Sequence, residues 1–299
     1  MPASRSADVP AQPAATLMLL DDRPDLSVLM LRRHRGSAFA GGMFVFPGGG
    51  VEADDTGAAI EGSCVGLSPA DANRRLGLPS GGLAYWVAAV RETFEEAGVL
   101  LARSPRTGDW LDLSDPAAAR RFAAHREAVD SGALPLAEVV RREGLALALG
   151  AIFYAAHWIT PPGLPRRYDT RFFLAPLPAG QTPLHDHRET VQSQWMRPAE
   201  ALERCADGAL ALLPPTLGML RILAGFADSA EVLAAAEAQQ DGPDHAVRIV
   251  RSGDTWRVLL PGDAREENGA LQTLQAWVRL RPPGGVAPEH GRGTRRERG

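Results

Sequence analysis

The stretch "VRETFEEAGV", residues 90–99, holds three glutamates within two turns of a helix. At about 100° per residue, Glu92 and Glu96 lie one turn apart on the same face, and Glu95 lies beside them. Carboxylates this close repel one another unless water screens them or a cation bridges them. Hard oxygen ligands in a cluster suit Mg²⁺ or Mn²⁺, which also bind substrate phosphates. The stretch therefore predicts a helix with either a divalent-metal site or a solvated acidic face.

The segment upstream favours the metal site. In "FPGGGVEADD", residues 46–55, a glycine turn offers backbone groups without side-chain obstruction, and Glu52, Asp54 and Asp55 follow it. Residues 56–83 then intervene, and they are rich in Gly and Pro that reverse the chain. We interpret them as an insertion that leaves the loop and the helix adjacent in space. Within it, "SPADANRRLGL", residues 68–78, predicts one or two helical turns over the cleft.

Together the two segments resemble the signature of the Nudix hydrolases, Gx5Ex7REUxEExGU, in which U is a bulky aliphatic residue. Gly49 matches the first glycine, Asp55 occupies the position of the first glutamate, and residues 91–99 supply the remainder. The sequence departs from the signature in having Asp at 55, in Thr93 at the aliphatic position, and in the long separation of the two halves. A signature interrupted here, with an intact "RETFEEAG", resembles the acyl-coenzyme A diphosphatase branch. That resemblance extends over most of residues 14–226.

The resemblance implies a set of catalytic residues. Mg²⁺ (or Mn²⁺) would be held by Glu92, Glu95 and Glu96, with the backbone carbonyl of Gly49 assisting. The general base would come from these carboxylates or from a glutamate in a later loop, for which Glu189 is the candidate. Arg91 is interpreted as a positioning residue, because an i,i+4 pair with Glu95 would fix a carboxylate.

Substrate phosphates need cationic partners, and the chain contains no lysine, so all 32 of its basic residues are arginines. This excludes a P-loop lysine and a Schiff base, and leaves arginine, backbone N–H groups or metal to hold phosphate. The predicted substrate-binding residues are Arg33, Arg166, Arg167 and Arg171. The alternative for the last three, in "RRYDTRFF", is an edge strand made soluble by arginine.

Other candidate residues have a structural explanation that we favour. His185 and His187 are close enough in sequence for a metal pair, but such a pair in a loop is more often simply exposed. Trp158 and Phe172 could stack on an adenine, yet aromatic residues in strands more often pack in the core. Cys64 and Cys205 lack the spacing of a zinc site and are interpreted as two structural thiols in a reducing compartment.

By the same resemblance, the protein would hydrolyse a diphosphate linkage, with coenzyme A or acyl-coenzyme A giving 3',5'-ADP and (acyl-)4'-phosphopantetheine. One alternative is another Nudix substrate, such as ADP-ribose, NADH, a dinucleoside polyphosphate or an RNA 5' end. An alternative of another class is a nucleotide-binding Nudix module without catalysis. The intact Glu92, Glu95 and Glu96 argue against that module, whereas Asp55 and Thr93 leave it open.

Apolar strands alternating with helices indicate an α/β (α+β) fold, and the resemblance implies a Nudix-type α/β/α sandwich with a mixed sheet. We expect a flexible N-terminus over residues 1–13, a Nudix domain over 14–281 and a disordered tail over 282–299. Within the domain, residues 115–149 are Ala- and charge-rich with helical periodicity, which predicts an inserted helical subdomain. Residues 245–262 predict a late hairpin around a Ser-Gly-Asp turn.

The amino-acid composition does not indicate a macromolecular partner. A net charge of -4 with 45% hydrophobic and 23% charged residues is typical of an ordinary globular protein and not of a nucleic-acid binder. We find no secretory signal and no apolar stretch that approaches the roughly 18 residues of a membrane span. The expectation is therefore a cytoplasmic protein that binds a small nucleoside diphosphate derivative, with no membrane or nucleic-acid partner, as a monomer or a homodimer.

Overall fold

The computed structural model describes residues 9–36, 40–186, 189–252, 255–261, 263, 270–272 and 275–285. Its main sheet is mixed, since β1 is parallel to β9 and antiparallel to β2 and β4. The strand order is β10 (Thr190–Met196), β2 (Leu26–Arg33), β1 (Gln12–Asp22), β9 (Tyr168–Pro176), β8 (Phe153–Ile159), β15 (Ala276–Val278) and β11 (His245–Ala246), with β3 (Phe44–Val45) paired to β2 and β4 (Gly48–Gly50) to β1.

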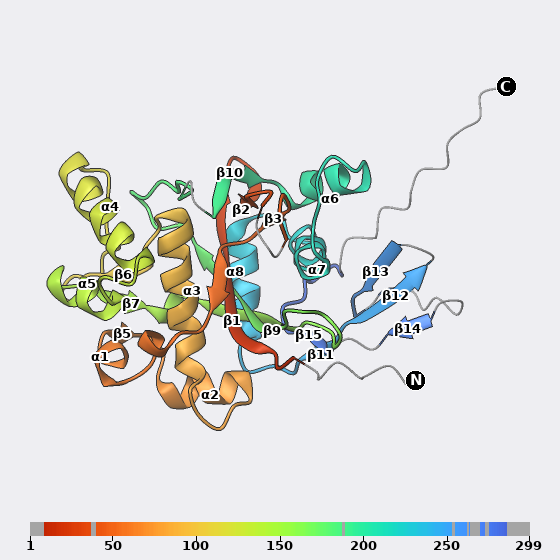
Figure 1. Ribbon diagram of the computed structural model, residues 1–299, viewed down its shortest axis with the longest axis horizontal. Coiled ribbons are helices and arrows are strands. Elements are labelled where there is room, and N and C mark those ends of the chain that lie inside the picture. Colours follow the sequence, from red (N-terminus) through yellow and green to blue (C-terminus); the bar gives the residue numbers. More distant parts are fainter. Residues whose placement is uncertain are drawn as a thin grey trace, which may run out of the picture.

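Two hydrophobic cores lie on opposite faces of this sheet, because successive side chains of a strand alternate between its faces. Leu17 and Leu19 of β1 pack with α3 (Gly82–Ala97) on one face. Met18 and Leu20 pack on the other face with α6 (Pro198–Ala206), α7 (Pro214–Leu223) and α8 (Ser229–Ala238). Figure 1 shows α3 and α8 on either side of β1. This arrangement confirms the predicted α/β/α sandwich with a mixed sheet.

The two segments that the sequence marked as insertions meet in one lobe beside α3 (Figure 1). The first holds η1 (Ala53–Asp55), α1 (Ala58–Glu61), β5 (Cys64–Val65) and α2 (Pro69–Leu76); the second holds α4 (Pro116–Asp130), α5 (Leu136–Arg142), β7 (Ala146–Ala148) and η2 (Leu149–Ala151). A small sheet joins them, since β7 pairs with β5 of the first segment and with β6 (Ala102–Arg103). Segments far apart in sequence therefore support each other.

The predicted short helix is present as α2, but it does not lie over the cleft, so its predicted position is wrong. It buries Ala72 and Leu76 against the first turns of α3, at the end of the helix away from the glutamates. The side-chain oxygen Oδ1 of Asn73 accepts a hydrogen bond of 2.7 Å from the backbone N–H of Gly82. The apolar side of α2 explains its place, because burying two apolar side chains against α3 is more favourable than covering a polar cleft.

The ends of the chain differ slightly from the expected boundaries. The strand β1 begins at Gln12, so Gln12 and Pro13 lie in the sheet and not in a flexible segment. Toward the C-terminus, β12 (Arg248–Ser252) pairs with β13 (Thr255–Leu259) and with β14 (Ala270–Gln272), whereas β11 belongs to the main sheet. Residues 1–8 and 286–299, which include most of the predicted tail, lie outside the described residues. Within the described part of the chain, no helix is both long and apolar enough to span a membrane.

Candidate active site

The glycine strand β4 lies directly against the glutamates of α3. Gly49 pairs with Ala15 of β1, and a Cβ atom at Gly49 would lie 2.5 Å from Oε1 of Glu92. The backbone N–H of Gly48 donates a 2.9 Å hydrogen bond to Oε2 of Glu96. A side chain at Gly49 would therefore displace Glu92. The predicted adjacency of the glycine loop and the helix, across the insertion, is confirmed.

Arg91 connects the loop to the helix through its whole guanidinium group. Its Nε and Nη2 donate to the two carboxylate oxygens of Asp55, at 2.9 and 3.0 Å, and Nη2 also donates to the carbonyl of Gly50 at 2.7 Å. Its Nη1 donates to Glu92 at 2.9 Å and to Glu95 at 3.0 Å, so the i,i+4 pair expected from the sequence is present. Although burial opposes it, hydrogen bonding to Asp55 and the charge of Glu92 raise the pKa of Arg91.

Thr93, which departs from the signature, is fully buried without leaving a polar group unsatisfied. Its hydroxyl donates a 2.7 Å hydrogen bond to the carbonyl of Ala89, one turn earlier in α3. Because a threonine can satisfy its hydroxyl within its own helix, it can replace an aliphatic residue here and still present a methyl group to the core.

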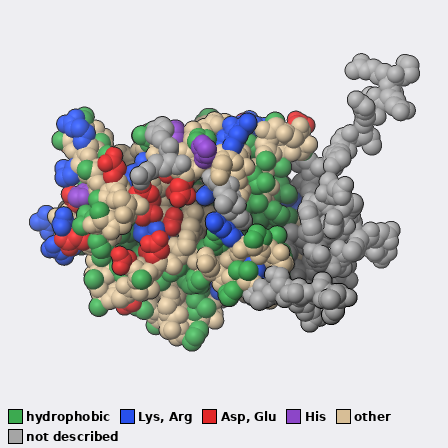
Figure 2. All heavy atoms as spheres, viewed as in Figure 1, with side chains coloured by type: hydrophobic (Ala, Val, Ile, Leu, Met, Phe, Trp, Pro, Cys, Tyr) green, Lys and Arg blue, Asp and Glu red, His purple; other side chains and the backbone are tan. Residues whose placement is uncertain are grey.

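The three glutamates lie close together, with Glu96 buried and the side chains of Glu92 and Glu95 each 13% exposed, and their negative charge is only partly compensated. Burial raises the pKa of Glu92 to about 7 and that of Glu95 to about 7, although Arg91 lowers both. Burial, followed by the charge of Glu92, raises the pKa of Glu96 well above its ordinary value. Figure 2 shows acidic side chains gathered over the C-terminal half of α3. The ionised cluster would gain stability from an added cation.

The donor set at this position fits a divalent cation by its chemistry. Carboxylate oxygens crowded in a buried place are the ligands that Mg²⁺ and Mn²⁺ prefer. Among the residues that the structure describes, no three Asp, Glu, His or Cys side chains already stand in a metal-binding arrangement. The reason is visible in the contacts, since Glu92 and Glu95 accept hydrogen bonds from Arg91, and Glu96 accepts one from Gly48. Side-chain rotations would be needed to converge on an ion.

Arg33 and Glu189, both selected from the sequence, reach this cluster from other elements. Nη1 of Arg33, at the end of β2, lies 3.7 Å from Oε1 of Glu96, and Nη2 lies 3.1 Å from Oε2 of Glu189. The backbone N–H of His34 donates to the carbonyl of Glu189 at 2.9 Å, which holds the segment in place. Nε of Arg33 is buried and has no hydrogen-bond partner among the described residues.

Two of the other three predicted substrate-binding arginines contact other parts of the chain. Arg167 donates to the carbonyls of Thr160 and Val9, at 3.0 and 2.8 Å, and so ties two backbone segments together. Arg171 is 6% exposed and lies over the ring of Tyr85, in the first turn of α3. Arg166 is exposed in the loop before β9. Arg91 lowers the pKa values of Glu92 and Glu95, and Arg33 lowers that of Glu96.

The remaining candidates are two aromatic residues and two histidines. Trp158 and Phe172 are buried in the core between the sheet and α7, on the face opposite α3, so the core interpretation is confirmed. The ring of His185 lies 3.4 Å from the hydroxyl of Ser193. His187 lies outside the described residues, and the suggested histidine pair therefore stays a prediction.

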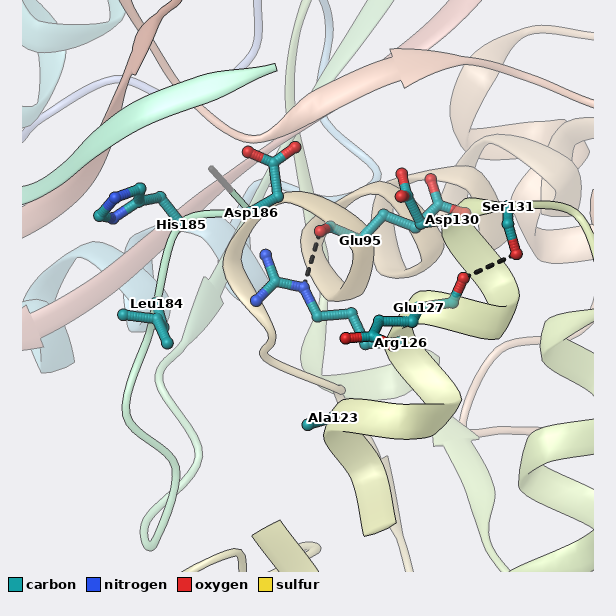
Figure 3. Close-up of a pocket in the computed structure, with 9 residues that line it drawn as sticks. All are labelled: Glu95, Ala123, Arg126, Glu127, Asp130, Ser131, Leu184, His185 and Asp186. Carbon is teal, nitrogen blue, oxygen red and sulfur yellow. Dashed lines mark hydrogen bonds between the residues drawn. The ribbon is translucent and has the colours of Figure 1, made fainter. Parts of the chain in front are cut away.

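A cavity of about 630 Å³ opens beside Glu95, between α4 and the segment Leu184–Asp186 (Figure 3). Arg126 of α4 points into it, and its Nε donates a 2.8 Å hydrogen bond to the main-chain carbonyl of Glu95. Sequence reasoning missed Arg126, because nothing in the pattern of residues 115–149 distinguishes it from the other arginines of that helix.

The mixed-sheet sandwich, with a "RETFEEAG" helix packed on a glycine strand, defines a Nudix domain. The chain belongs to the family described as NUDT19 Nudix domain, whose model matches residues 69–223.

The relatives and a solved structure agree with this membership. The acyl-coenzyme A diphosphatase NUDT19 of Gallus gallus is 30% identical over 276 residues, covering 80% of this chain and 72% of that protein. The human protein of the same name is 29% identical over 284 residues, covering 83% of this chain and 75% of that protein. A crystal structure of a Nudix hydrolase from Alicyclobacillus acidocaldarius is 27% identical with a TM-score of 0.62, covering 76% of this chain and 97% of that one.

Proposed function

We propose that the protein is a metal-dependent Nudix diphosphatase that cleaves coenzyme A or acyl-coenzyme A to 3',5'-ADP and (acyl-)4'-phosphopantetheine. The observation that carries the proposal is the cluster of Glu92, Glu95 and Glu96, buried against the glycine strand with only partly compensated charge. The relatives named acyl-coenzyme A diphosphatase support the choice of substrate.

In this proposal Glu92, Glu95, Glu96 and the carbonyl of Gly49 would hold Mg²⁺ or Mn²⁺, in keeping with the general use of divalent metals by Nudix hydrolases. When bound, the metal would neutralise the diphosphate and lower the pKa of an attacking water. Arg91, fixed by Asp55, orients the carboxylates of Glu92 and Glu95. Its role is that of a positioning residue.

Glu189 is proposed to accept the proton of the attacking water. Its side chain is 60% exposed, and its charge acts on Glu92 and Glu96, which places it at the open side of the cluster. Arg33 lies between Glu189 and Glu96 with an unpartnered Nε, so it can donate to a phosphate oxygen while keeping both carboxylates in place.

Replacing Glu96 with Gln tests the site. Turnover of coenzyme A with Mg²⁺, followed by phosphorus NMR, should fall by about 10²-fold or more, because the group that orders metal and water is lost. The melting temperature without metal should not fall, since burial already disfavours the ionised form of Glu96. The exposed Glu61 provides the control, and Glu61→Gln should leave turnover unchanged. Near-normal activity of Glu96→Gln would show that this helix does not bind the catalytic metal.

The same assay separates the alternatives when wild-type protein is offered coenzyme A, long-chain acyl-coenzyme A, ADP-ribose, NADH and a dinucleoside polyphosphate. Attack at the diphosphate leaves one phosphate on each half, so 3',5'-ADP is the diagnostic product. Cleavage of ADP-ribose without cleavage of coenzyme A would show that the substrate is another nucleoside diphosphate derivative. Binding without any cleavage would favour the non-catalytic module. A cytoplasmic location and a small-molecule partner without nucleic acid are part of the proposal, and size-exclusion chromatography would distinguish a homodimer from a monomer.

A further inference from the structure

The cavity beside Glu95 is continuous with the carboxylate cluster but is built by other elements. One wall is α4, from the inserted helical segment, and the opposite wall is Leu184–Asp186 (Figure 3). The backbone N–H of Leu184 donates to the carbonyl of Ala97 at 2.9 Å, which anchors this wall to the end of α3. Asp186 accepts hydrogen bonds from the backbone N–H groups of Glu189 and Thr190, at 3.0 and 2.9 Å. The cavity is thus lined by Glu95 on the side of α3, and its wall at Asp186 is hydrogen-bonded to the backbone of Glu189.

The lining of the cavity is acidic, with a single cation among its described residues. The carboxylates are Glu95, Glu127, Asp130 and Asp186, and the cation is Arg126. Nη2 of Arg126 is buried and lacks a hydrogen-bond partner among the described residues, so a donor there is available to a ligand. Ala123 and Leu184, the latter 56% exposed, add apolar surface. The cavity therefore offers acceptors, one donor and apolar contacts.

This chemistry discriminates between the two halves of coenzyme A. The 3',5'-ADP half carries a further phosphate, which a wall of four carboxylates would repel. The pantetheine arm is uncharged and carries hydroxyl and amide N–H donors, amide carbonyls and methylene groups. Carboxylates accept from those donors, a guanidinium donates to a carbonyl, and apolar side chains contact methylenes.

We infer that the cavity between α4 and Leu184–Asp186 binds the uncharged pantetheine arm of coenzyme A, with Arg126 donating to one of its carbonyl oxygens. The inference rests on the proposed function. It assigns the inserted helical segment to substrate selection, and it leaves the 3',5'-ADP half on the other side of the carboxylate cluster.

The test compares two neighbouring alanines of α4. Ala123 and Ala124 are both exposed, but only Ala123 lines the cavity, so Ala123→Trp blocks it and Ala124→Trp is a matched control. Arg126 is the poorer test, because it also holds the backbone of Glu95. The Michaelis constant for coenzyme A is measured, together with inhibition by pantetheine and by 3',5'-ADP. Leu184→Trp, on the opposite exposed wall, is a second variant should Ala123→Trp fold poorly.

We expect Ala123→Trp to raise the KM for coenzyme A and the inhibition constant of pantetheine by about tenfold or more, with unchanged inhibition by 3',5'-ADP and unchanged kcat. Ala124→Trp should behave as the wild type. Unchanged KM in Ala123→Trp and Leu184→Trp, or weaker inhibition by 3',5'-ADP instead of pantetheine, would overturn the assignment and leave the proposed function standing. Absence of coenzyme A cleavage by the wild type would overturn both.

Discussion

At the scale of single residues, the pair of Asp55 and Arg91 holds the site together. The two residues lie on opposite sides of a long insertion, yet they form two parallel hydrogen bonds and are both buried. Asp55 is itself placed by the backbone N–H of Glu52, which donates to its Oδ2 at 2.8 Å. Arg91 also donates to Glu92 and Glu95, so a substitution at Asp55 would change the positions of these two carboxylates through the side chain of Arg91.

Replacing Asp55 with Asn should therefore destabilise the protein and reduce its activity. Arg91 would keep Glu92 and Glu95 but lose the charged acceptor of its Nε and Nη2, which should cost about 1–3 kcal/mol of unfolding free energy, measured by urea denaturation. The neighbouring Asp54 is exposed, and Asp54→Asn serves as the control with an unchanged transition. Asp55→Glu, which restores the residue of the Nudix signature, should recover most of the stability. An unchanged urea midpoint in Asp55→Asn would show that Arg91 is held by its other partners.

Sequence reasoning located the residues whose positions follow from local geometry. Glu92, Glu95 and Glu96 share a helix face by periodicity alone, and Gly49 and Asp55 follow from the signature. The roles of Arg126 and of the cavity could not be predicted, because they depend on how α4 is placed against α3. The misplacement of α2 has the same origin, since a short helix can bury its apolar side in several places. The local sequence pattern predicts which residues share a face of a helix, whereas the contacts between distant segments depend on tertiary packing.

Cys64 provides a prediction about pH. Burial, followed by the charge of Glu61, raises the pKa of its thiol to about 12, and the thiol donates to the carbonyl of Ile60. The thiolate is the reactive form, so a raised pKa lowers reactivity throughout the neutral range. At pH 8 alkylation of Cys64 by iodoacetamide should be at least about a hundredfold slower in the folded than in the unfolded protein, and should accelerate as pH rises. Rapid alkylation at pH 7, located by mass spectrometry, would contradict this environment.

At the scale of elements, the first insertion is part of the core and not a detachable cover. Ile60, Leu67 and Leu76 of this segment belong to the same hydrophobic core as Trp86 and Val87 of α3. Replacing residues 57–82 with a short linker would therefore expose one side of α3 and lower the stability of the site. The packing of α2 against α3 therefore predicts that such a variant loses stability as well as the segment itself.

The contact between α2 and α3 can be tested at Gly82. A Cβ atom there would lie 2.8 Å from the carbonyl carbon of Ala72, closer than two such atoms can stand. Helix propensity favours Ala over Gly by about 1 kcal/mol, whereas overpacking against backbone costs about 1–3 kcal/mol. Backbone atoms of Ala72 cannot move aside as a flexible side chain would, so we expect the cost of overpacking to exceed the gain in helix propensity. Gly82→Ala should therefore lower the melting temperature. A rise in melting temperature would mean that α2 can move away from α3 without loss.

At the scale of the whole molecule, two smaller units lie beside the main sheet and its helices. The insertion lobe lies beside α3, and the strands β12, β13 and β14 form a separate small sheet (Figure 1). Arg221 of α7 links this C-terminal part to the body. It is 1% exposed, its Nη1 donates to the carbonyl of Val258 at 2.7 Å, and it forms two hydrogen bonds with Asp263 at 2.8 and 2.9 Å. A charge so deeply buried depends on its partner.

Replacing Asp263 with Asn should consequently weaken the whole fold, although the site lies far along the chain from the glutamates. Removing the carboxylate of Asp263 from the buried guanidinium of Arg221 costs about 3 kcal/mol, which lowers the melting temperature by roughly 5–10 °C in a protein of this size. The exposed ion pair of Arg74 and Asp241 offers a matched control, because solvent screens it, and Asp241→Asn should leave the melting temperature unchanged. Equal melting temperatures for Asp263→Asn and Asp241→Asn would show that the ion pair of Arg221 with Asp263 adds nothing to the stability of the protein.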